Sequence, residues 1–299
     1  MEQRFGFLLL TSHLGNPERK PLTGPQLRTL TQRIRLLGLP GEDRELTEAD
    51  LLSLGYDRQM AQHIYDLLQD TALMKEYLRK AASRRCQPIP RQDPRYPLSV
   101  RRRLGADSPG CLWAKGDVGV LSCPAISLVG SRDLRPDNLE FAWEVGRQAA
   151  LQGYTLVSGN ARGADQAGQE GCLQNGGKVI SVVADALHSY LETPGVLYLS
   201  EEDYDFPFST FRALRRNRVI HSLADVVFVA QSAWERGGTW RGTTQNLSSG
   251  WSRVYCFRDG SEASVQLEQM GAALIGFDAL RDIPSLMKPE RNLLALLQK

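Results

Sequence analysis

"SLVGSRDLRP" at residues 127–136 and "VSGNARGADQAG" at residues 157–168 share one pattern. In each, a short apolar run ends at a turn of small residues, and a helix-like segment follows. Strands that alternate with helices are typical of α/β proteins, in which a parallel sheet is covered on both faces. The turn between strand and helix is where such proteins hold phosphate groups. The two stretches therefore predict an α/β fold and a site for a nucleotide cofactor, a nucleotide substrate or a nucleic-acid backbone.

The same alternation continues through the second half of the chain. Helix-like segments lie at residues 138–153 and 163–177. Short apolar runs typical of buried strands lie at residues 125–130, 155–159, 178–184, 196–201, 225–231 and 253–257. The predicted fold class is α/β: a Rossmann-like, doubly wound, mostly parallel sheet, preceded by a small all-α domain.

The first 82 residues are rich in leucine, arginine, glutamine and glutamate, with apolar spacings of about three and four that indicate several short helices. Thr47, with Asp50 three residues later, predicts a capped helix start, and Gly55 predicts a tight turn between two helices. The proline-rich residues 87–97 cannot form a helix and mark a join. The expected domains are a small helical domain (SAM-like or helix-hairpin-like) at 1–88, a Rossmann-like domain at 89–285 and a short C-terminal tail at 286–299.

Composition narrows the function classes. The 299 residues carry a formal net charge of +2, which is too small to indicate nucleic-acid binding unless basic residues cluster locally. The five cysteines are scattered without metal-ligand spacing, so we expect reduced cytosolic thiols and no metal site. No signal peptide or membrane span is recognisable, and a cytoplasmic protein is expected. Because the dinucleotide fingerprint GxGxxG and the Walker sequence are both missing, no cofactor is expected.

Ligands of an open parallel sheet bind beyond the carboxyl ends of its strands. Four segments follow strand-like runs and could converge there, at residues 130–132, 158–165, 200–201 and 237–239. Arg132 and Arg162 offer guanidinium groups that match phosphate bidentately. The small residues let a backbone approach an anion closely, although ordinary turns and helix caps use the same residue types. These small residues are Gly130, Ser131, Ser158, Gly159 and Gly163.

Other residues have more than one interpretation. Glu201 either holds a ribose hydroxyl or caps a turn. Lys178 precedes a strand at the end opposite the predicted crevice, so the local pattern makes it a surface lysine. His221 follows a basic run and is expected to be structural or on the surface rather than a catalytic base. Candidate base-stacking residues, each equally compatible with a place in the core, are Phe211, Trp234 and Trp240.

Several motifs occur in the order and spacing of a known family. They are "DPRYPLSVRRRL" (93–104), "GCLWAKGDVGVLSCPAISLVGSRD" (110–133), "LVSGNARGADQAG" (156–168), "GGKVISVV" (176–183), "LSE" (199–201), "RRNRVIHSLADVVFVAQ" (215–231) and "GGT" (237–239). With these motifs, residues 90–275 resemble the DNA-processing protein A family (DprA, also called Smf). The resemblance implies a Rossmann-like domain that binds single-stranded DNA, forms a homodimer and hands the strand to a RecA-type recombinase during transformation.

The resemblance also implies binding residues. It assigns DNA contacts to Arg132 and Lys178, with the basic segment at residues 215–218 close by, and so gives Lys178 a role that the local pattern does not. No catalytic residue is expected. The candidate DNA-phosphate-binding residues are Gly130, Ser131, Arg132, Ser158, Gly159, Asn160, Arg162, Gly163, Lys178, Arg215, Arg216, Asn217 and Arg218.

The chain departs from the family pattern in three places. The family's Tyr-Pro pair is missing from residues 184–195, "RGGTWRGTT" (236–244) replaces a Ser-Gly-Ser turn, and "TTQNLSSGW" (243–251) replaces an Ala-rich helix. These departures fit a divergent branch of the family, with a defence setting as one alternative. Two other functions stay open: a sensor of a nucleotide-derived signal, and a LOG-like hydrolase of nucleoside monophosphates. The hydrolase lacks its carboxylate, since Gln245 stands nearest to the expected glutamate position.

Overall fold

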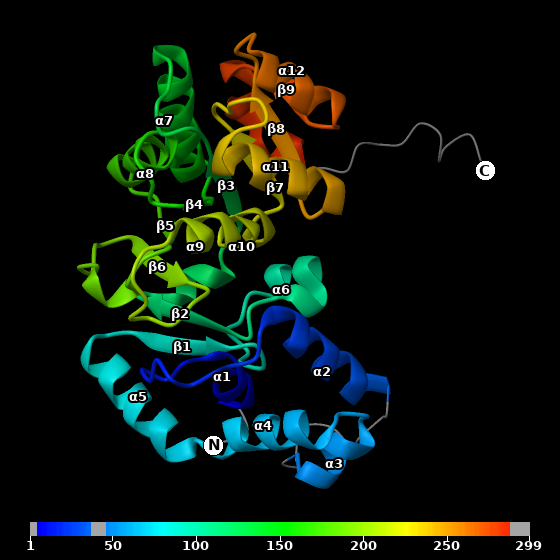
Figure 1. Cartoon of the computed structure of the whole chain (residues 1–299). Coiled ribbons are helices and arrows are strands. Elements are labelled where there is room, and N and C mark those ends of the chain that lie inside the picture. The colour runs from blue at the N-terminus through cyan, green and yellow to red at the C-terminus, as the bar shows by residue number, and fades with distance from the viewer. Residues whose placement is uncertain (1–4, 37–45, 288–299) are drawn as a thin grey trace, which may run out of the picture. The chain divides into compact units, whose positions relative to one another are not determined.

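The computed structural model describes residues 5–36 and 46–287. The chain divides into two compact units, each formed from two segments of the sequence. The first unit consists of residues 1–123 and 179–223, and the second of residues 124–178 and 224–299. Strands and helices alternate along the chain, which confirms the predicted α/β class (Figure 1).

The first unit begins with helices, as predicted. Thr47 and Asp50 form the expected reciprocal cap: the Thr47 hydroxyl accepts the Asp50 N–H at 3.2 Å, and the Asp50 carboxylate accepts the Thr47 N–H at 2.9 Å. Gly55 makes the expected turn with a φ of 80°. The leucines of these helices share one buried core with Ile64. The helices are α1 (Gly6–Thr11), α2 (Gly24–Leu36), α3 (Glu48–Ser53), α4 (Arg58–Gln69) and α5 (Thr71–Ser83).

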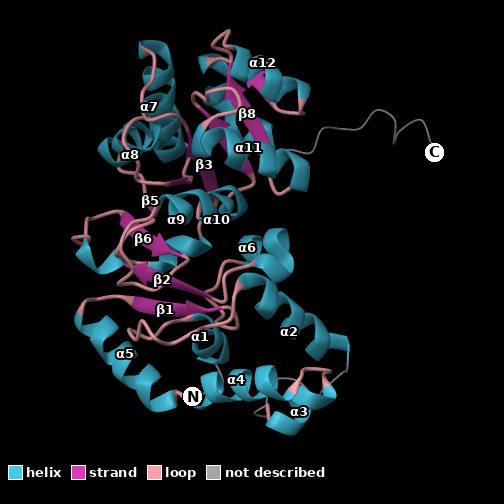
Figure 2. Cartoon of the chain, viewed as in Figure 1, coloured by secondary structure: helices cyan, strands magenta, loops and turns pink. Residues whose placement is uncertain are grey.

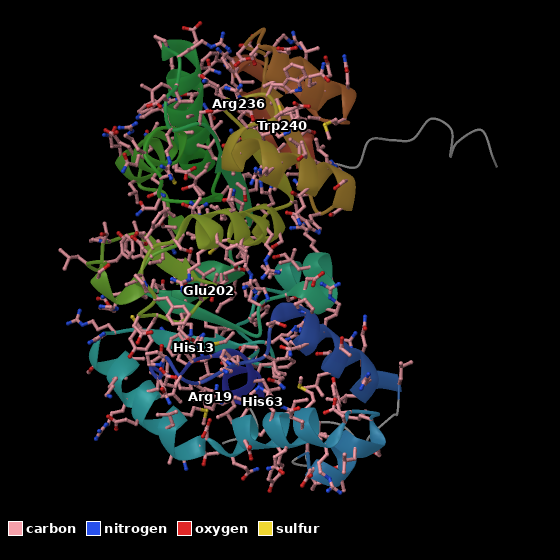
Figure 3. The ribbon with its side chains drawn as sticks, viewed as in Figure 1. His13, Arg19, His63, Glu202, Arg236 and Trp240 are labelled. Carbon is pink, nitrogen blue, oxygen red and sulfur yellow. The ribbon has the colours of Figure 1, made fainter. Side chains whose placement is uncertain are left out.

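A buried arginine ties these helices together. Arg19 donates to the backbone oxygens of Leu9 at 2.6 Å, of Leu67 at 2.9 Å and of Ser12, and it pairs with Asp70 at 2.7 Å (Figure 3). Leu9 and Leu67 lie near the ends of α1 and α4, where carbonyl oxygens lack partners within the helix. One guanidinium group therefore satisfies acceptors from two helices at once.

Strands of both directions follow in the first unit. Their order is β1-β2-β6-β5, and only β5 and β6 are parallel. The proline-rich segment forms the edge strand β1, a position at which a missing N–H is tolerated. The strands are β1 (Gln87–Pro90), β2 (Cys111–Lys115), β5 (Val179–Val182) and β6 (Val196–Ser200), and the accompanying helices are α6 (Leu98–Leu104), α9 (Thr210–Arg215) and α10 (Asn217–Leu223).

The second unit is entirely parallel in its strand pairing. Its strands follow the order β4-β3-β7-β8-β9. The helices α7 and α8 pack against β3 and β4, and α11 and α12 pack against β8 (Figure 2). The strands are β3 (Ala125–Val129), β4 (Thr155–Ser158), β7 (Val226–Val229), β8 (Arg253–Phe257) and β9 (Ala273–Ile275). The helices are α7 (Pro136–Leu151), α8 (Ala164–Gln174), α11 (Gly237–Ser249), α12 (Glu262–Gln269) and α13 (Ile283–Met287).

The predicted elements can be compared with these bounds. All six predicted strands are present, as β3 to β8, and the two predicted helices are α7 and α8. The segment at residues 243–251, which replaces the family's Ala-rich helix, is itself helical as far as Ser249, the last residue of α11. The expected domain boundaries at residues 88 and 285 stay predictions. Of the expected tail at 286–299, only residues 286 and 287 belong to the described part of the chain. Among the described residues, no helix is long and apolar enough to cross a membrane.

Candidate functional site

The turn after β3 is anchored to the end of β7 in the second unit. The backbone N–H of Ser131 donates to the Gln231 carbonyl oxygen at 3.0 Å, and its hydroxyl donates to the same oxygen at 3.3 Å. The Gln231 amide group accepts the Arg135 N–H at 3.0 Å and donates to the Asp133 carbonyl at 3.2 Å. Residues 130–135, called the Ser131 turn below, are therefore held at both ends, and the Ser131 hydroxyl is used within the fold.

Two glycines allow the predicted turns after β3 and β4 to pack together. A Cβ atom at Gly130 would collide with the Cβ of Ala164. Gly163 has a φ of 87°, and a Cβ there would lie 2.6 Å from the Ser131 carbonyl oxygen. The Ala164 N–H donates to that same oxygen at 3.2 Å. The structure thus brings the "GSR" and "SGNARGAD" segments into direct contact.

Two arginines project from this pair of turns. Arg132 is exposed, and no ion pair involves it within the described residues. Arg162 is also exposed and pairs with the exposed Asp133 at 2.8 Å. A pair so open to water contributes about 0–1 kcal/mol, so Arg162 can exchange its partner for another anion at little cost. Arg132 offers its guanidinium without any such exchange.

The other predicted residues of the second turn face inward. Ser158 is fully buried, and its hydroxyl accepts from Gln169 at 2.6 Å. Gly159 is buried, and Asn160 adopts the left-handed region with a φ of 60°. The Ala161 N–H donates to the carboxylate of Asp165 at 3.0 Å. These residues shape the turn, and among its side chains the structure gives Arg162 the greatest access to solvent.

Lys178 lies at the amino-terminal end of the parallel strands, whereas the Ser131 turn follows their carboxyl-terminal end. Its carbonyl oxygen accepts the Leu156 N–H at 2.9 Å, and Leu156 pairs with Ile126 near the start of β3. Arg132 follows the end of that strand, at least three residue spacings or about 10 Å further along. The exposed Lys178 therefore does not share a local site with Arg132. A ligand that contacts both has to extend along the strands.

The basic segment at residues 215–218 belongs to the first unit and carries its own counter-charges. Arg218 donates to Glu201 at 2.9 Å, and Arg215 lies 3.3 Å from the other oxygen of the same carboxylate. Arg215 also pairs with Glu202 at 3.1 Å. Arg216 is buried and donates to the Asn217 side-chain oxygen at 2.9 Å. The four predicted DNA-binding residues here thus engage one another and two glutamates.

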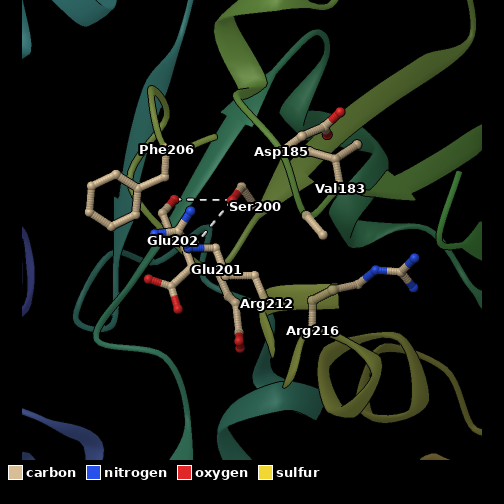
Figure 4. A pocket seen from close by; sticks show the side chains of 9 residues that line it. Val183, Asp185, Ser200, Glu201, Glu202, Phe206, Arg212 and Arg216 are labelled. Carbon is tan, nitrogen blue, oxygen red and sulfur yellow. Dashed lines mark hydrogen bonds between the residues drawn. The ribbon is translucent and has the colours of Figure 1, made fainter. Parts of the chain in front are cut away.

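The Glu202 carboxyl lies beside a small pocket in the same unit (Figure 4). The side chains that line the pocket leave no internal space for even a water-sized sphere, so a nucleotide does not fit. Ser200 closes one side, because its hydroxyl donates to the Glu202 carbonyl at 3.1 Å and accepts the Glu202 N–H at 3.2 Å. Burial, assisted by the charge of Glu201, raises the pKa of Glu202. The lining residues are Val183, Ala184, Asp185, Ser200, Glu201, Glu202, Phe206, Arg212 and Arg216.

His221 is a structural residue, as expected. It is almost fully buried, and burial together with the charge of Arg216 lowers its pKa to about 3. The imidazole is therefore neutral at pH 7 and enclosed by the fold. Among the described residues, no group of three or more His, Cys, Asp or Glu side chains is placed to hold a metal ion.

Sequence reasoning missed the residues that support the Ser131 turn. The buried Asn138 donates to the Ala230 carbonyl at 2.7 Å and to Asp259 at 2.8 Å, which joins α7 to the ends of β7 and β8. Arg135 pairs with the same carboxylate at 2.5 Å. Burial on its own would raise the pKa of Asp259, but hydrogen bonds, chiefly from Ser261 and then from Asn138, lower it to about 2. The available signal was a polar residue, Asn138, at the first position of a predicted amphipathic helix.

The aromatic residues named from the sequence differ in exposure. Phe211 on α9 is 71% exposed, and Trp234 after β7 is 43% exposed. Trp240 in the first turn of α11 is partly exposed. By contrast, Trp113 is 1% exposed and packs edge-on against Tyr77 at 5.6 Å. All three candidate side chains are thus accessible to solvent, and none of them is buried in the core, which was the other interpretation of the sequence.

Comparisons with known proteins agree with one another. The family model described as DNA recombination-mediator protein A matches residues 87–275. The chain is similar to Protein Smf of Escherichia coli (strain K12), with 31% identity over 143 residues that cover 44% of this chain and 38% of that protein. It is also similar to DNA processing protein DprA of Streptococcus pneumoniae, with 28% identity over 210 residues that cover 65% of this chain and 70% of that protein. The match therefore spans well under half of Protein Smf.

Solved structures show the same fold. The X-ray structure of DNA processing protein A from Streptococcus pneumoniae superposes with a TM-score of 0.72 at 24% identity, covering 97% of this chain and 99% of that one. DNA processing protein A from Helicobacter pylori, whose structure is described as showing a unique single-stranded DNA binding mode, gives a TM-score of 0.58 at 22% identity. That comparison covers 67% of this chain and 96% of the other.

Proposed function

The chain belongs to the DNA recombination-mediator protein A family, and we propose that it binds single-stranded DNA through phosphate contacts at the Ser131 turn. The observation that carries this proposal is the side chain of Arg132, which is exposed on a turn held at both ends by Gln231. Because the backbone of the turn is held in place and no described carboxylate pairs with Arg132, its guanidinium group is available to phosphate oxygens without breaking an existing ion pair. Arg162 adds a second cation on the adjoining turn.

Binding along the strands accommodates both residues that the family resemblance names. Arg132 and Lys178 are exposed at opposite ends of the parallel strands. This spacing suits an extended polyanion better than a single nucleotide. The single-stranded DNA binding attributed to the Helicobacter pylori protein supports the choice of ligand. A basic track of this kind binds many sequences alike, and its affinity falls as salt rises. We further propose that the DNA-bound chain forms a homodimer and delivers the strand to a RecA-type recombinase.

Binding is favoured over hydrolysis by the carboxylates near the Ser131 turn. Asp259, whose pKa is about 2, stays ionised and engaged by Arg135, so it cannot serve as a proton donor near neutral pH. Asp133 is exposed and pairs with Arg162. Gln245, at the position where a LOG-type enzyme carries its glutamate, is exposed on α11 and lacks a titratable group.

Fluorescence anisotropy of a labelled oligonucleotide tests the proposal. We expect the full-length protein to bind it with an affinity that falls steeply with salt, and Arg132→Ala to weaken binding about tenfold for every sequence tried. Arg102→Ala is a matched control, because Arg102 is an exposed arginine on α6 outside the predicted site. Unchanged binding in Arg132→Ala would contradict the site. If no oligonucleotide binds and a small nucleotide instead raises the melting temperature, the sensor alternative is supported.

A further inference from the structure

The segment that leads from β7 into the start of α11 carries two tryptophans among arginines. Trp234 is 43% exposed, Trp240 is partly exposed, and Arg236 and Arg241 are exposed. We call residues 232–241 the Trp234 loop. Its only acidic residue is Glu235, so the loop carries a formal charge of +1. This is the place at which the sequence departs from the family's Ser-Gly-Ser turn, which has neither indole nor guanidinium groups.

The fold holds the Trp234 loop next to the Ser131 turn. Gln231, which anchors the Ser131 turn, is three residues before Trp234, and three residues span at most about 11 Å. The Arg236 N–H donates to the Ala233 carbonyl at 3.2 Å and closes a turn with Trp234 and Glu235 at its tip. Trp234 is therefore tethered near Arg132.

The second tryptophan is placed by the start of a helix. Arg236 is the N-cap residue of α11, and Trp240 follows four residues later in the first turn of the same helix; Figure 3 labels both residues. That first turn contains no acidic residue. An indole next to a guanidinium, both open to solvent, matches a nucleotide: the ring stacks on a base, and the cation contacts a phosphate or stacks in turn.

We propose that the Trp234 loop is a base-stacking site, in which Trp234 and Trp240 contact bases of the same single strand whose phosphates contact Arg132. The inference rests on the proposed DNA-binding function and assigns it a second kind of contact. Stacking is tolerant of sequence because every base has a π-face. The Ser131 turn then recognises the backbone, and the Trp234 loop distinguishes a strand that exposes its bases from a duplex in which they are paired.

Two oligonucleotides of equal length separate these contacts. One is oligothymidine, and the other carries abasic sites throughout, so that it keeps the phosphates and lacks the bases. We expect Trp234→Ala to weaken binding of oligothymidine by the full-length protein about tenfold and to change binding of the abasic strand less than about twofold. Trp240→Ala should behave in the same way. Arg132→Ala should weaken both strands, because its contact is with phosphate.

Two control variants and melting temperatures distinguish a loss of base stacking from a loss of folding and from the general effect of removing a tryptophan. Trp234→Phe preserves an aromatic face and should retain most of the affinity. Trp251→Ala removes an equally large, partly exposed indole that precedes β8, at the end of the parallel strands opposite the Trp234 loop. This variant should bind both oligonucleotides as the wild-type protein does. Melting temperatures show whether each variant is folded.

The outcomes distinguish this inference from the proposed function. If the wild-type protein binds both strands and the two tryptophan variants weaken both equally or neither, base stacking is wrong while DNA binding stands. If Trp234→Ala changes the oligomeric state and leaves the difference between the strands intact, the loop contacts a second copy of the chain, and stacking is again wrong. If the wild-type protein binds neither strand, the proposed function fails and the stacking site fails with it.

Discussion

Arg218 donates to the carboxylate of Glu201 at 2.9 Å, in a place where the Glu201 side chain is 2% exposed and that of Arg218 is 13% exposed. Arg215 lies 3.3 Å from the second oxygen of the same carboxylate. A glutamate so deeply buried needs its cationic partners, because an unpaired buried charge is costly. Arg218 thus has a defined task inside the first unit, which differs from the direct phosphate contact that the basic motif indicates.

We therefore predict that Arg218→Ala destabilises the fold. Removing Arg218 leaves the buried Glu201 carboxylate with Arg215 as its remaining arginine partner, and the loss of the charged hydrogen bond should lower the free energy of unfolding by about 2 kcal/mol, measured by urea denaturation. Arg162→Ala serves as the control, since its pair with Asp133 is open to solvent and should change stability by less than about 1 kcal/mol. A variant Arg218→Ala with unchanged stability and weakened DNA binding would instead make Arg218 a phosphate ligand.

The contact between the two turns leads to a second prediction. Gly163→Ala should destabilise the protein more than Gly153→Ala, although the two glycines have φ values of 87° and 78°. An alanine is strained by the positive φ at both positions, and more so at Gly163, whose ψ of −122° lies outside the left-handed helical region. At Gly153 nothing lies within 4 Å of the added Cβ, whereas at Gly163 the Cβ meets the Ser131 carbonyl oxygen at 2.6 Å.

The measurements for these glycines are urea denaturation and oligonucleotide binding. Gly163→Ala should also weaken DNA binding, because relief of the clash displaces the backbone that carries Arg132. Gly153→Ala should bind DNA as the wild-type protein does. Equal loss of stability in both variants would show that the turns separate freely and that Gly163 is required only for its backbone conformation.

Local pattern predicted the strand ends, because a strand of β-branched and apolar residues that stops at glycine needs only neighbouring residues to be recognised. The Ser131 turn was found in this way, whereas its closeness to the turn at Gly163 was raised only by the general rule that strand-end segments of a parallel sheet can converge. The pairing of Arg218 with Glu201 was not predictable, since the two residues are seventeen apart and meet only after β6 and α10 have packed. A run of arginines carries the same signal whether it faces DNA or a buried carboxylate.

The sequence also did not indicate that β1 and β2 are strands or that they pair in the antiparallel direction. β1 and β2 run antiparallel to their neighbours, and the four residues of β1 include two prolines, so neither alternation nor length indicated a strand. Exposure of Trp234 and Trp240 depended equally on tertiary structure, because an indole suits a core as well as a surface. The resemblance to a family supplied Lys178, which no local pattern connects with Arg132.

A third prediction concerns pH. Asp203 is buried and accepts the His13 N–H at 2.8 Å. Burial raises its pKa from 3.8 to about 7, against the opposing effect of hydrogen bonds from Ser12 and His13. Between these two values the folded protein holds a proton that the unfolded chain has released, so the contribution of Asp203 to stability is greatest below about pH 4 and is lost as pH rises towards 7.

Urea denaturation between pH 4 and pH 8 measures this effect. The contribution of Asp203 has a slope of at most about 1.4 kcal/mol per pH unit. Asp203→Asn keeps an oxygen that can accept the His13 N–H but does not titrate, so its stability should vary less with pH over this window. Asp133→Asn, at an exposed carboxylate, should follow the wild-type curve. An Asp203→Asn curve parallel to the wild type would show that Asp203 is ionised throughout.

The separation of Arg132 and Lys178 gives the last prediction. Because the two residues lie at opposite ends of the parallel strands, with their backbones separated by at least about 10 Å along the strand direction, we expect them to contact different phosphates of one strand and to act independently. Each single alanine variant should reduce the slope of log affinity against log salt by about 0.7, and the double variant by about 1.4. Their binding free energies should add to within about 0.5 kcal/mol. Anisotropy titrations at several salt concentrations, with Arg102→Ala as the control, measure both quantities.

If the double variant binds as well as Arg132→Ala alone, the DNA strand does not pass Lys178, and the phosphate site is confined to the Ser131 turn and its neighbour at Arg162.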